Sequence, residues 1–144
     1  MFSSAAEYAI KACIWIATQS TKGKLVTIDE IVDNTQLQRA FTAKVLQTLA
    51  SEKVIGSVKG RHGGFFIPEN APERISLFDI VQAIDGNKLL HECVLGLKIC
   101  SDVKPCPAHF KYVEIKKRLT DFLLNTSLLD LTKGVDDKEF FLNF

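Results

Sequence analysis

The first part of the chain is a long run of mostly apolar residues. From Ala5 to Ala17 the run is interrupted by Glu7 and Lys11. An apolar stretch of this length that carries two charges is too short to cross a bilayer, and no basic leader of the kind found in signal peptides precedes it. We therefore expect a buried helix over residues 4–19, no contact with a membrane, and a cytoplasmic protein.

Two further helices joined by a tight turn are predicted next. Thr27 and Glu30 form the Thr-x-x-Glu pattern of a capping box, which predicts a short helix that ends near Asn34. After a turn at 35–36, residues 37–52 carry apolar side chains at helical spacing. These apolar positions are Leu37, Phe41, Val45, Leu46 and Leu49. Two short helices around a tight turn are typical of a helix-turn-helix.

The second of these helices has a polar and basic outer face. Residues off the apolar stripe include Gln38, Arg39, Thr42 and Lys44. A helix with such a face can enter the major groove of DNA, and we expect these four side chains to face the bases. Helix pairs with a solvated charged face are also common in other proteins, so this pattern alone leaves both interpretations open.

Two strand-like runs follow, over residues 53–60 and 63–69, with a glycine-rich tip between them. This pattern predicts a β-hairpin. Lys59, Arg61 and His62 lie at the tip, where glycines allow close approach to another surface and basic side chains can follow a phosphate backbone. A helix-turn-helix followed by such a hairpin is a winged helix. The predicted fold class is thus mainly α with a small β-hairpin wing.

The second half of the chain predicts a short helix and a long one. Ser76 and Asp79 form a capping pattern for a helix that runs to about Asp85, and Pro107 suits the first turn of a final long helix. That helix has the a/d spacing of one that packs against a partner, at Tyr112, Ile115, Leu119 and Phe122. We therefore predict three regions: a DNA-binding domain (1–86), a cysteine-rich loop (87–107) and a dimerisation helix with its tail (108–144).

Composition is that of one folded domain. The 144 residues are 47% hydrophobic and 24% charged, which does not favour disorder. The net charge of +1 hides a basic window, because residues 36–62 contain five Lys and Arg residues and one acid. This local charge permits nucleic-acid binding. The chain has no Ser-His-Asp set, HExxH helix, Walker loop or dinucleotide fingerprint, so we expect no enzyme.

Three cysteines and a histidine lie close together in the predicted loop. They are Cys93, Cys100, Cys106 and His109, whose thiolate and imidazole groups can hold an iron-sulfur cluster or a soft metal ion. A structural zinc site is an alternative, although zinc ligands are usually two to four residues apart and gaps of six and five are wide for it. A metal-free thiol switch that forms a disulfide is another. Cys13 lies apart from these residues, on the first predicted helix, where we expect it to be a small apolar residue of the core.

Several segments together resemble one known family. They are SSAAEYAIKACIWIA, VTIDEIVDNTQL, VLQTLASEKVIGSVKGRHGGFFI, ISLFDIVQAIDG and the three spaced cysteines. In this order and combination they resemble the IscR/NsrR family of bacterial winged-helix transcription regulators. The resemblance covers nearly the whole chain.

The resemblance implies a homodimer that reads a palindromic operator in double-stranded DNA. It also implies a sensor of redox state, nitric oxide or iron-sulfur supply, with a cluster held by Cys93, Cys100 and Cys106. His109 stands three residues after the last cysteine, where the IscR branch has its fourth ligand, which favours a 2Fe-2S over a 4Fe-4S cluster. Glu7 is the alternative fourth ligand, supplied across the dimer. Such a cluster is readily absent from protein purified in air.

Overall fold

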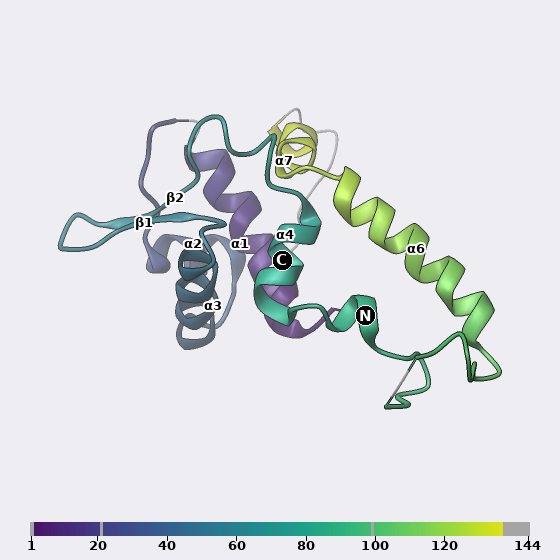
Figure 1. The fold of residues 1–144 in the computed structure, drawn as a ribbon. Coiled ribbons are helices and arrows are strands. Elements are labelled where there is room, and N and C mark those ends of the chain that lie inside the picture. Colours follow the sequence, from purple (N-terminus) through teal and green to yellow (C-terminus); the bar gives the residue numbers. More distant parts are fainter. Residues whose placement is uncertain (1, 21, 99, 137–144) are drawn as a thin grey trace.

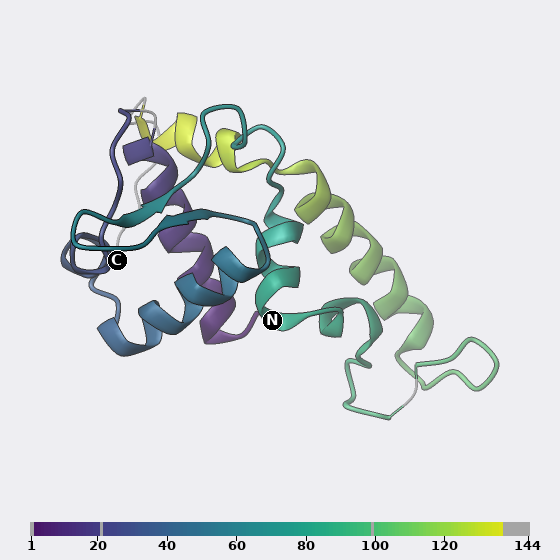
Figure 2. The same cartoon turned by 60° about the vertical axis from the view of Figure 1, so that its left-hand side comes forward.

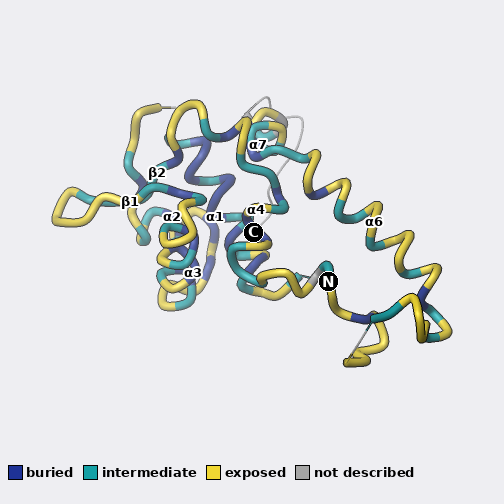
Figure 3. The backbone as a smooth tube through the Cα atoms, in the orientation of Figure 1, coloured by how far each residue is buried: buried dark blue, intermediate teal, exposed yellow. Residues whose placement is uncertain are grey.

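Helix α1 (Ser4–Ser20) lies at the centre of the computed structural model, which describes residues 2–20, 22–98 and 100–136 (Figure 1). Its neighbours are α3, α4 and α7, and its side chains at Ala9, Ala12 and Ile16 are fully buried. Small alanine side chains let neighbouring helices approach closely. Cys13 is also fully buried, so its predicted place in the core is confirmed. Figure 3 shows buried backbone along much of α1.

The predicted helix-turn-helix and hairpin are both present, so the fold class is confirmed. Helices α2 (Ile28–Thr35) and α3 (Arg39–Ser51) are followed by β1 (Gly56–Val58) and β2 (Gly64–Phe66). The two strands are antiparallel and shorter than the strand-like runs in the sequence. Val26 pairs with Phe65 through two backbone hydrogen bonds of 2.9 and 2.8 Å, which fastens the base of the hairpin to the segment before α2. The hairpin tip projects from the helical body (Figure 1).

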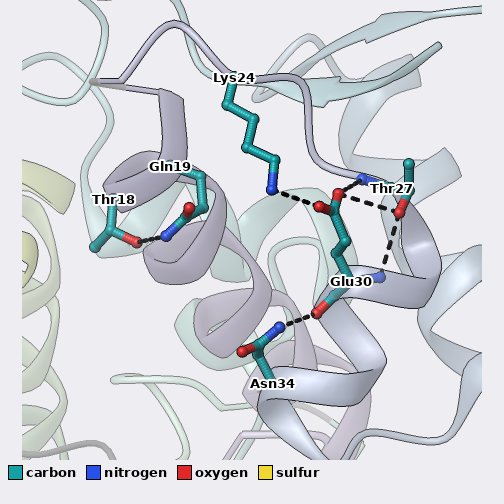
Figure 4. Close-up of polar contacts among 6 residues, drawn as sticks. All are labelled: Thr18, Gln19, Lys24, Thr27, Glu30 and Asn34. Atoms are coloured by element: carbon teal, nitrogen blue, oxygen red, sulfur yellow. Dashed lines mark hydrogen bonds and ion pairs between the residues drawn. The ribbon is translucent and has the colours of Figure 1, made fainter. Parts of the chain in front are cut away.

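The helix starts follow from local hydrogen bonds. The Thr27 backbone amide donates to the Glu30 carboxylate at 2.9 Å and the Glu30 amide donates to the Thr27 hydroxyl at 3.3 Å, which confirms the predicted capping box (Figure 4). Lys24 forms an ion pair with the same carboxylate at 2.5 Å. Ser76 and Asp79 cap α4 (Leu77–Asp85) in the same reciprocal way, as predicted. Both carboxylates thus satisfy amides that the helices leave unpaired.

Among the described residues of the C-terminal half, two helices occur beyond those predicted. After α4 comes α5 (Lys88–His91), then the loop, then α6 (His109–Asn125) and α7 (Leu128–Asp136). Ser127 caps α7 through Asp130, and Leu128 is fully buried where α7 returns to α1. Helix α6 extends away from the body and carries the loop at its far end, opposite the hairpin (Figures 1 and 2). Over the described residues no helix combines the length and apolarity needed to span a membrane.

Candidate DNA-binding surface and cysteine loop

Helix α3 presents a polar outer face, with one difference from the predicted set. Gln38, Arg39 and Lys44 are exposed, but Thr42 is fully buried. The prediction that Thr42 faces DNA is therefore wrong. Thr42 lies three, four and seven residues before the buried Val45, Leu46 and Leu49, so it is on the core face of the helix. Its hydroxyl donates to the Gln38 carbonyl at 2.9 Å, which satisfies the one polar group that burial would leave unpaired.

Arg39 is held by a carboxylate of the neighbouring helix. Its Nε donates to Asp29 Oδ1 at 2.6 Å and its Nη2 to Oδ2 at 3.4 Å. The hydrogen bond from Arg39 lowers the pKa of the Asp29 carboxyl. Both side chains are exposed, and exposed ion pairs contribute little to stability, so a phosphate or a base can replace Asp29 as the partner of this guanidinium.

The hairpin tip carries the other predicted basic residues. Lys59, Arg61 and His62 are all exposed. Gly60 has a φ of 109°, which only glycine adopts without strain. Between the hairpin and the helices lies an open groove of about 700 Å³, with Asp29 and Arg39 among its helical residues and Lys59 on the hairpin side. A basic wing beside a polar helix gives a surface that can bind a nucleic-acid backbone.

The four predicted ligands of the cysteine loop form two pairs. Cys93 Sγ and Cys106 Sγ are 4.0 Å apart, and Cys100 Sγ is 3.4 Å from His109 Nδ1. The other ring nitrogen of His109 lies 2.6 Å from the Asp102 carboxylate. Among residues 2–20, 22–98 and 100–136, no three His, Cys, Asp or Glu side chains are grouped so that they could hold one metal ion. The structure therefore brings the donors together two by two.

The spacing within each pair suits two ligands of one metal. In a tetrahedral site with bonds of about 2.3 Å to sulfur, two sulfurs lie roughly 3.8 Å apart, and a sulfur and a nitrogen roughly 3.6 Å. The distances of 4.0 and 3.4 Å are close to these values. Asp102 accepts a hydrogen bond from Nε2 of His109, so the lone pair of Nδ1 is directed toward Cys100. Each pair by itself thus has the spacing of two ligands of one metal ion.

The cysteines differ in their surroundings. Hydrogen bonding from the Leu95 backbone lowers the pKa of the Cys93 thiol, and Cys106 and Lys116 act in the same direction. Burial raises the pKa of Cys13 to about 12. A thiol of that pKa is a poor ligand and a poor nucleophile. Glu7, the alternative ligand, is exposed in the first turn of α1 and takes part in neither pair.

Helix α6 exposes large apolar side chains to solvent. Ile115 and Phe122, two of the four predicted partner positions, are 61% and 54% exposed, while Tyr112 and Leu119 are half-buried. Phe110 is 71% exposed. Exposed apolar residues gathered on one element mark an interaction surface. The exposure of Ile115 and Phe122 leaves this helix available to a partner, and its packing against one stays a prediction.

One residue of the cysteine site has no signal in the sequence. Lys116 donates from Nζ to the carbonyl oxygens of Leu90 at 3.1 Å and Glu92 at 3.0 Å. Its ammonium lies 5.0 Å from the centre of the Tyr112 ring. Twenty-four or more residues separate Lys116 from these carbonyls. Spacing along the chain therefore could not reveal the contact.

A helix-turn-helix with a basic hairpin defines the class of winged-helix transcription regulators. Within this class the chain belongs to the Rrf2 family, described as iron-dependent transcriptional regulators, whose model matches residues 2–134. The predicted resemblance to regulators of this type is confirmed. The chain is a transcription regulator of a DNA-binding family and not an enzyme.

Individual relatives and solved structures agree with this family. An HTH-type transcriptional regulator of Aquifex aeolicus is 32% identical over 143 residues, covering 98% of this chain and 96% of its own length. The regulator IscR of Pectobacterium atrosepticum is 27% identical over 137 residues, which cover 95% of this chain and 80% of its own length. The structure of T. potens IscR superposes with a TM-score of 0.75 at 19% identity, over 99% of this chain and 93% of that one. CymR, described as the global cysteine regulator of B. subtilis, gives a TM-score of 0.71 at 18% identity, over 92% of this chain and 96% of its own.

Proposed function

We propose that this chain is a cytoplasmic, homodimeric transcription regulator that binds a palindromic operator and senses redox state, nitric oxide or iron-sulfur supply. The sensor is a cluster held by Cys93, Cys100, Cys106 and His109. The observation that carries this proposal is the arrangement of these four donors, three on the loop and His109 at the start of α6, as two pairs. Two copies of α6, packed through apolar side chains such as Ile115 and Phe122, form the dimer.

A 2Fe-2S cluster matches the paired donors, because each of its two irons takes two protein ligands. Cys93 and Cys106 would bind one iron, and Cys100 and His109 the other. When bound, the cluster supplies a one-electron redox centre. Asp102 would fix the ring of His109, as carboxylates commonly do for metal-binding histidines. His109 is favoured over Glu7 because it already lies beside Cys100.

Protein purified without oxygen is expected to be coloured and to contain about two irons and two sulfides per chain. His109→Ala should change the visible spectrum and speed loss of colour, because it removes one ligand of an iron. Glu7→Ala should do neither. Absorbance spectra with iron and sulfide analysis measure both effects. A histidine variant identical to the unmodified protein, together with a Glu7 variant that loses its colour, would reverse the choice of fourth ligand.

A metal-free thiol switch is the second candidate, and the Cys93–Cys106 distance of 4.0 Å favours it. Hydrogen peroxide would take two electrons and two protons from these thiols, giving a disulfide and two waters. A structural zinc ion bound by the same residues would leave the protein colourless. Colourless protein with one zinc per chain, or with no metal and a Cys93–Cys106 disulfide, would replace the cluster by one of these alternatives.

For DNA we propose that Gln38, Arg39 and Lys44 face the major groove. Lys59, Arg61 and His62 then follow the backbone or the adjacent minor groove. All six side chains are exposed, on two elements that border one groove. Thr42 has no place in this set because it is buried.

Substitutions in the two groups of proposed DNA-binding residues should affect DNA affinity in different ways. Arg39→Ala should weaken binding to the operator by about ten- to hundredfold, because a lost base contact costs specific binding most. Lys59→Ala should weaken operator and random DNA alike and flatten the dependence of log affinity on log salt by about one unit. Titrations at several salt concentrations measure both, with Lys111→Ala on the exposed part of α6 as the control. Equal losses on operator and random DNA for both variants would contradict the assignment.

A further inference from the structure

Lys116 joins the middle of α6 to the segment that enters the cysteine loop. Its ammonium donates to the carbonyl oxygens of Leu90 and Glu92, and Cys93 is the next residue. The contact with the Tyr112 ring, one turn earlier on α6, holds the same ammonium from another side. The side chain of Lys116 is half-buried, so water screens these contacts less than at an open surface.

The segment that Lys116 holds has little structure of its own. Helix α5 spans four residues, and the last carbonyls of a helix lack partners within it. A cation at this end satisfies those carbonyls and is favoured by the helix dipole. From residue 92 to 108 the described chain forms neither helix nor strand. The hydrogen bonds from Lys116 therefore attach to α6 the last residues before the chain loses regular secondary structure.

Both ends of the donor set are attached to the same face of α6. His109 is the first residue of α6, and Lys116 follows it by seven residues, two helical turns and about 10 Å along the axis. His109 belongs to the helix itself, while Cys93 is held to it through Lys116. Cys93 is buried, whereas Cys100 and Cys106 are partly exposed.

We propose that Lys116 is a positioning residue that holds the Cys93 end of the cysteine loop against α6. The first and last donors are thereby placed relative to one rigid element, and this element carries the apolar face proposed for the dimer. The role of Lys116 toward a cluster rests on the proposed function, whereas the effect of Lys116 on the position of Cys93 can be measured in metal-free protein.

The first test measures how fast iodoacetamide alkylates Cys93 in reduced, metal-free protein, by mass spectrometry of its peptide with Cys100 as the internal reference. Lys116→Met keeps the length and apolar character of the side chain and removes the donor. Cys93 should then react about tenfold faster, because the segment is released from α6. Loss of the positive charge by itself would slow the reaction, so acceleration reports release. Lys117→Met, at an exposed neighbour on the same helix, should match the unmodified protein, and Lys116→Arg should restore most of the protection.

The second test measures loss of cluster absorbance after a chelator is added, which should also be about tenfold faster for Lys116→Met. Circular dichroism shows whether each variant is folded. If Lys116→Met is not folded, the comparison of Lys116→Arg with the unmodified protein still tests the proposal. Equal rates of Cys93 alkylation for Lys116→Met and Lys117→Met would overturn the proposal. Faster alkylation in a protein that takes up no cluster would support the positioning role and refute the cluster as its purpose.

Discussion

Replacement of Cys93, Cys100 or Cys106 by Ser is expected to abolish the coloured form of the protein, whereas Cys13→Ser leaves it intact. Serine offers a hard oxygen in place of the soft thiolate that iron-sulfur clusters require. Each loop cysteine belongs to a pair, so its loss would leave the proposed iron at that pair with one protein ligand. Cys13 lies in the core with a pKa of about 12 and has no part in the site. Visible absorbance and iron content after anaerobic reconstitution measure the effect.

Cys13→Ser is also the matched control for cysteine removal as such. Its thermal unfolding should be recorded, because a serine hydroxyl at this buried position destabilises the core. Cys100 and Cys106 are partly exposed, and Cys93 is buried but lies outside the main core cluster, so variants of all three should unfold near the temperature of the unmodified metal-free protein. A loop variant that keeps full colour and iron would remove that cysteine from the ligand set.

Cluster-bound and metal-free protein should differ about 5- to 150-fold in affinity for the specific operator. Within one chain the loop lies at the opposite end of the molecule from the hairpin, so we expect a cluster there to act without touching DNA bound at that hairpin (Figure 1). We propose that the cluster would act by favouring one arrangement of α6 against the DNA-binding elements. It could shift that equilibrium only by its own difference in affinity for the two arrangements. The affinity for random DNA should change much less, because contacts with the DNA backbone depend less on the distance between the two DNA-binding domains of a dimer. Fluorescence anisotropy at one fixed salt concentration measures both affinities.

Cys93→Ser supplies the control for this second experiment. After attempted reconstitution it should bind the operator like the metal-free protein, which separates the cluster from the reagents used to build it. If both forms of the unmodified protein bind the operator equally well, the cysteine loop has no sensing role, even where the DNA-binding assignment holds.

Features set by neighbouring residues were predictable from the sequence. The Thr27–Glu30 and Ser76–Asp79 boxes depend on residues three apart, and the helices begin where the boxes predict. The start of α7 carries the same local signal in Ser127 and Asp130, so it too can be predicted. Thr42 shows the limit of judging by residue type. Its helical spacing to Val45 and Leu49 indicates the core, and its hydroxyl is satisfied locally, so a polar residue is buried at low cost.

Features set by distant residues could not be read from the sequence. The sequence supplies the four donors of the loop, but their division into Cys93 with Cys106 and Cys100 with His109 depends on how the chain is folded back. Likewise, the Arg39–Asp29 pair joins side chains ten residues apart, and Lys116 donates to backbone carbonyls 26 and 24 residues before it. Composition predicts that such residues can interact, and the fold selects which of them do.

The return of α7 to α1 has a consequence for synthesis of the protein. Leu128 completes the packing around α1, yet about a hundred residues separate the two helices in the chain. At about 5–20 residues per second, a ribosome needs roughly 5–20 s to deliver α7 after α1 has been made. During this interval the part of the chain that contains α1 to α4 lacks the core side chains that α7 supplies. Incomplete chains that end within α6 therefore lack the α7 side chains of this core, and only chains that already contain the cysteine loop and α6 complete the DNA-binding fold.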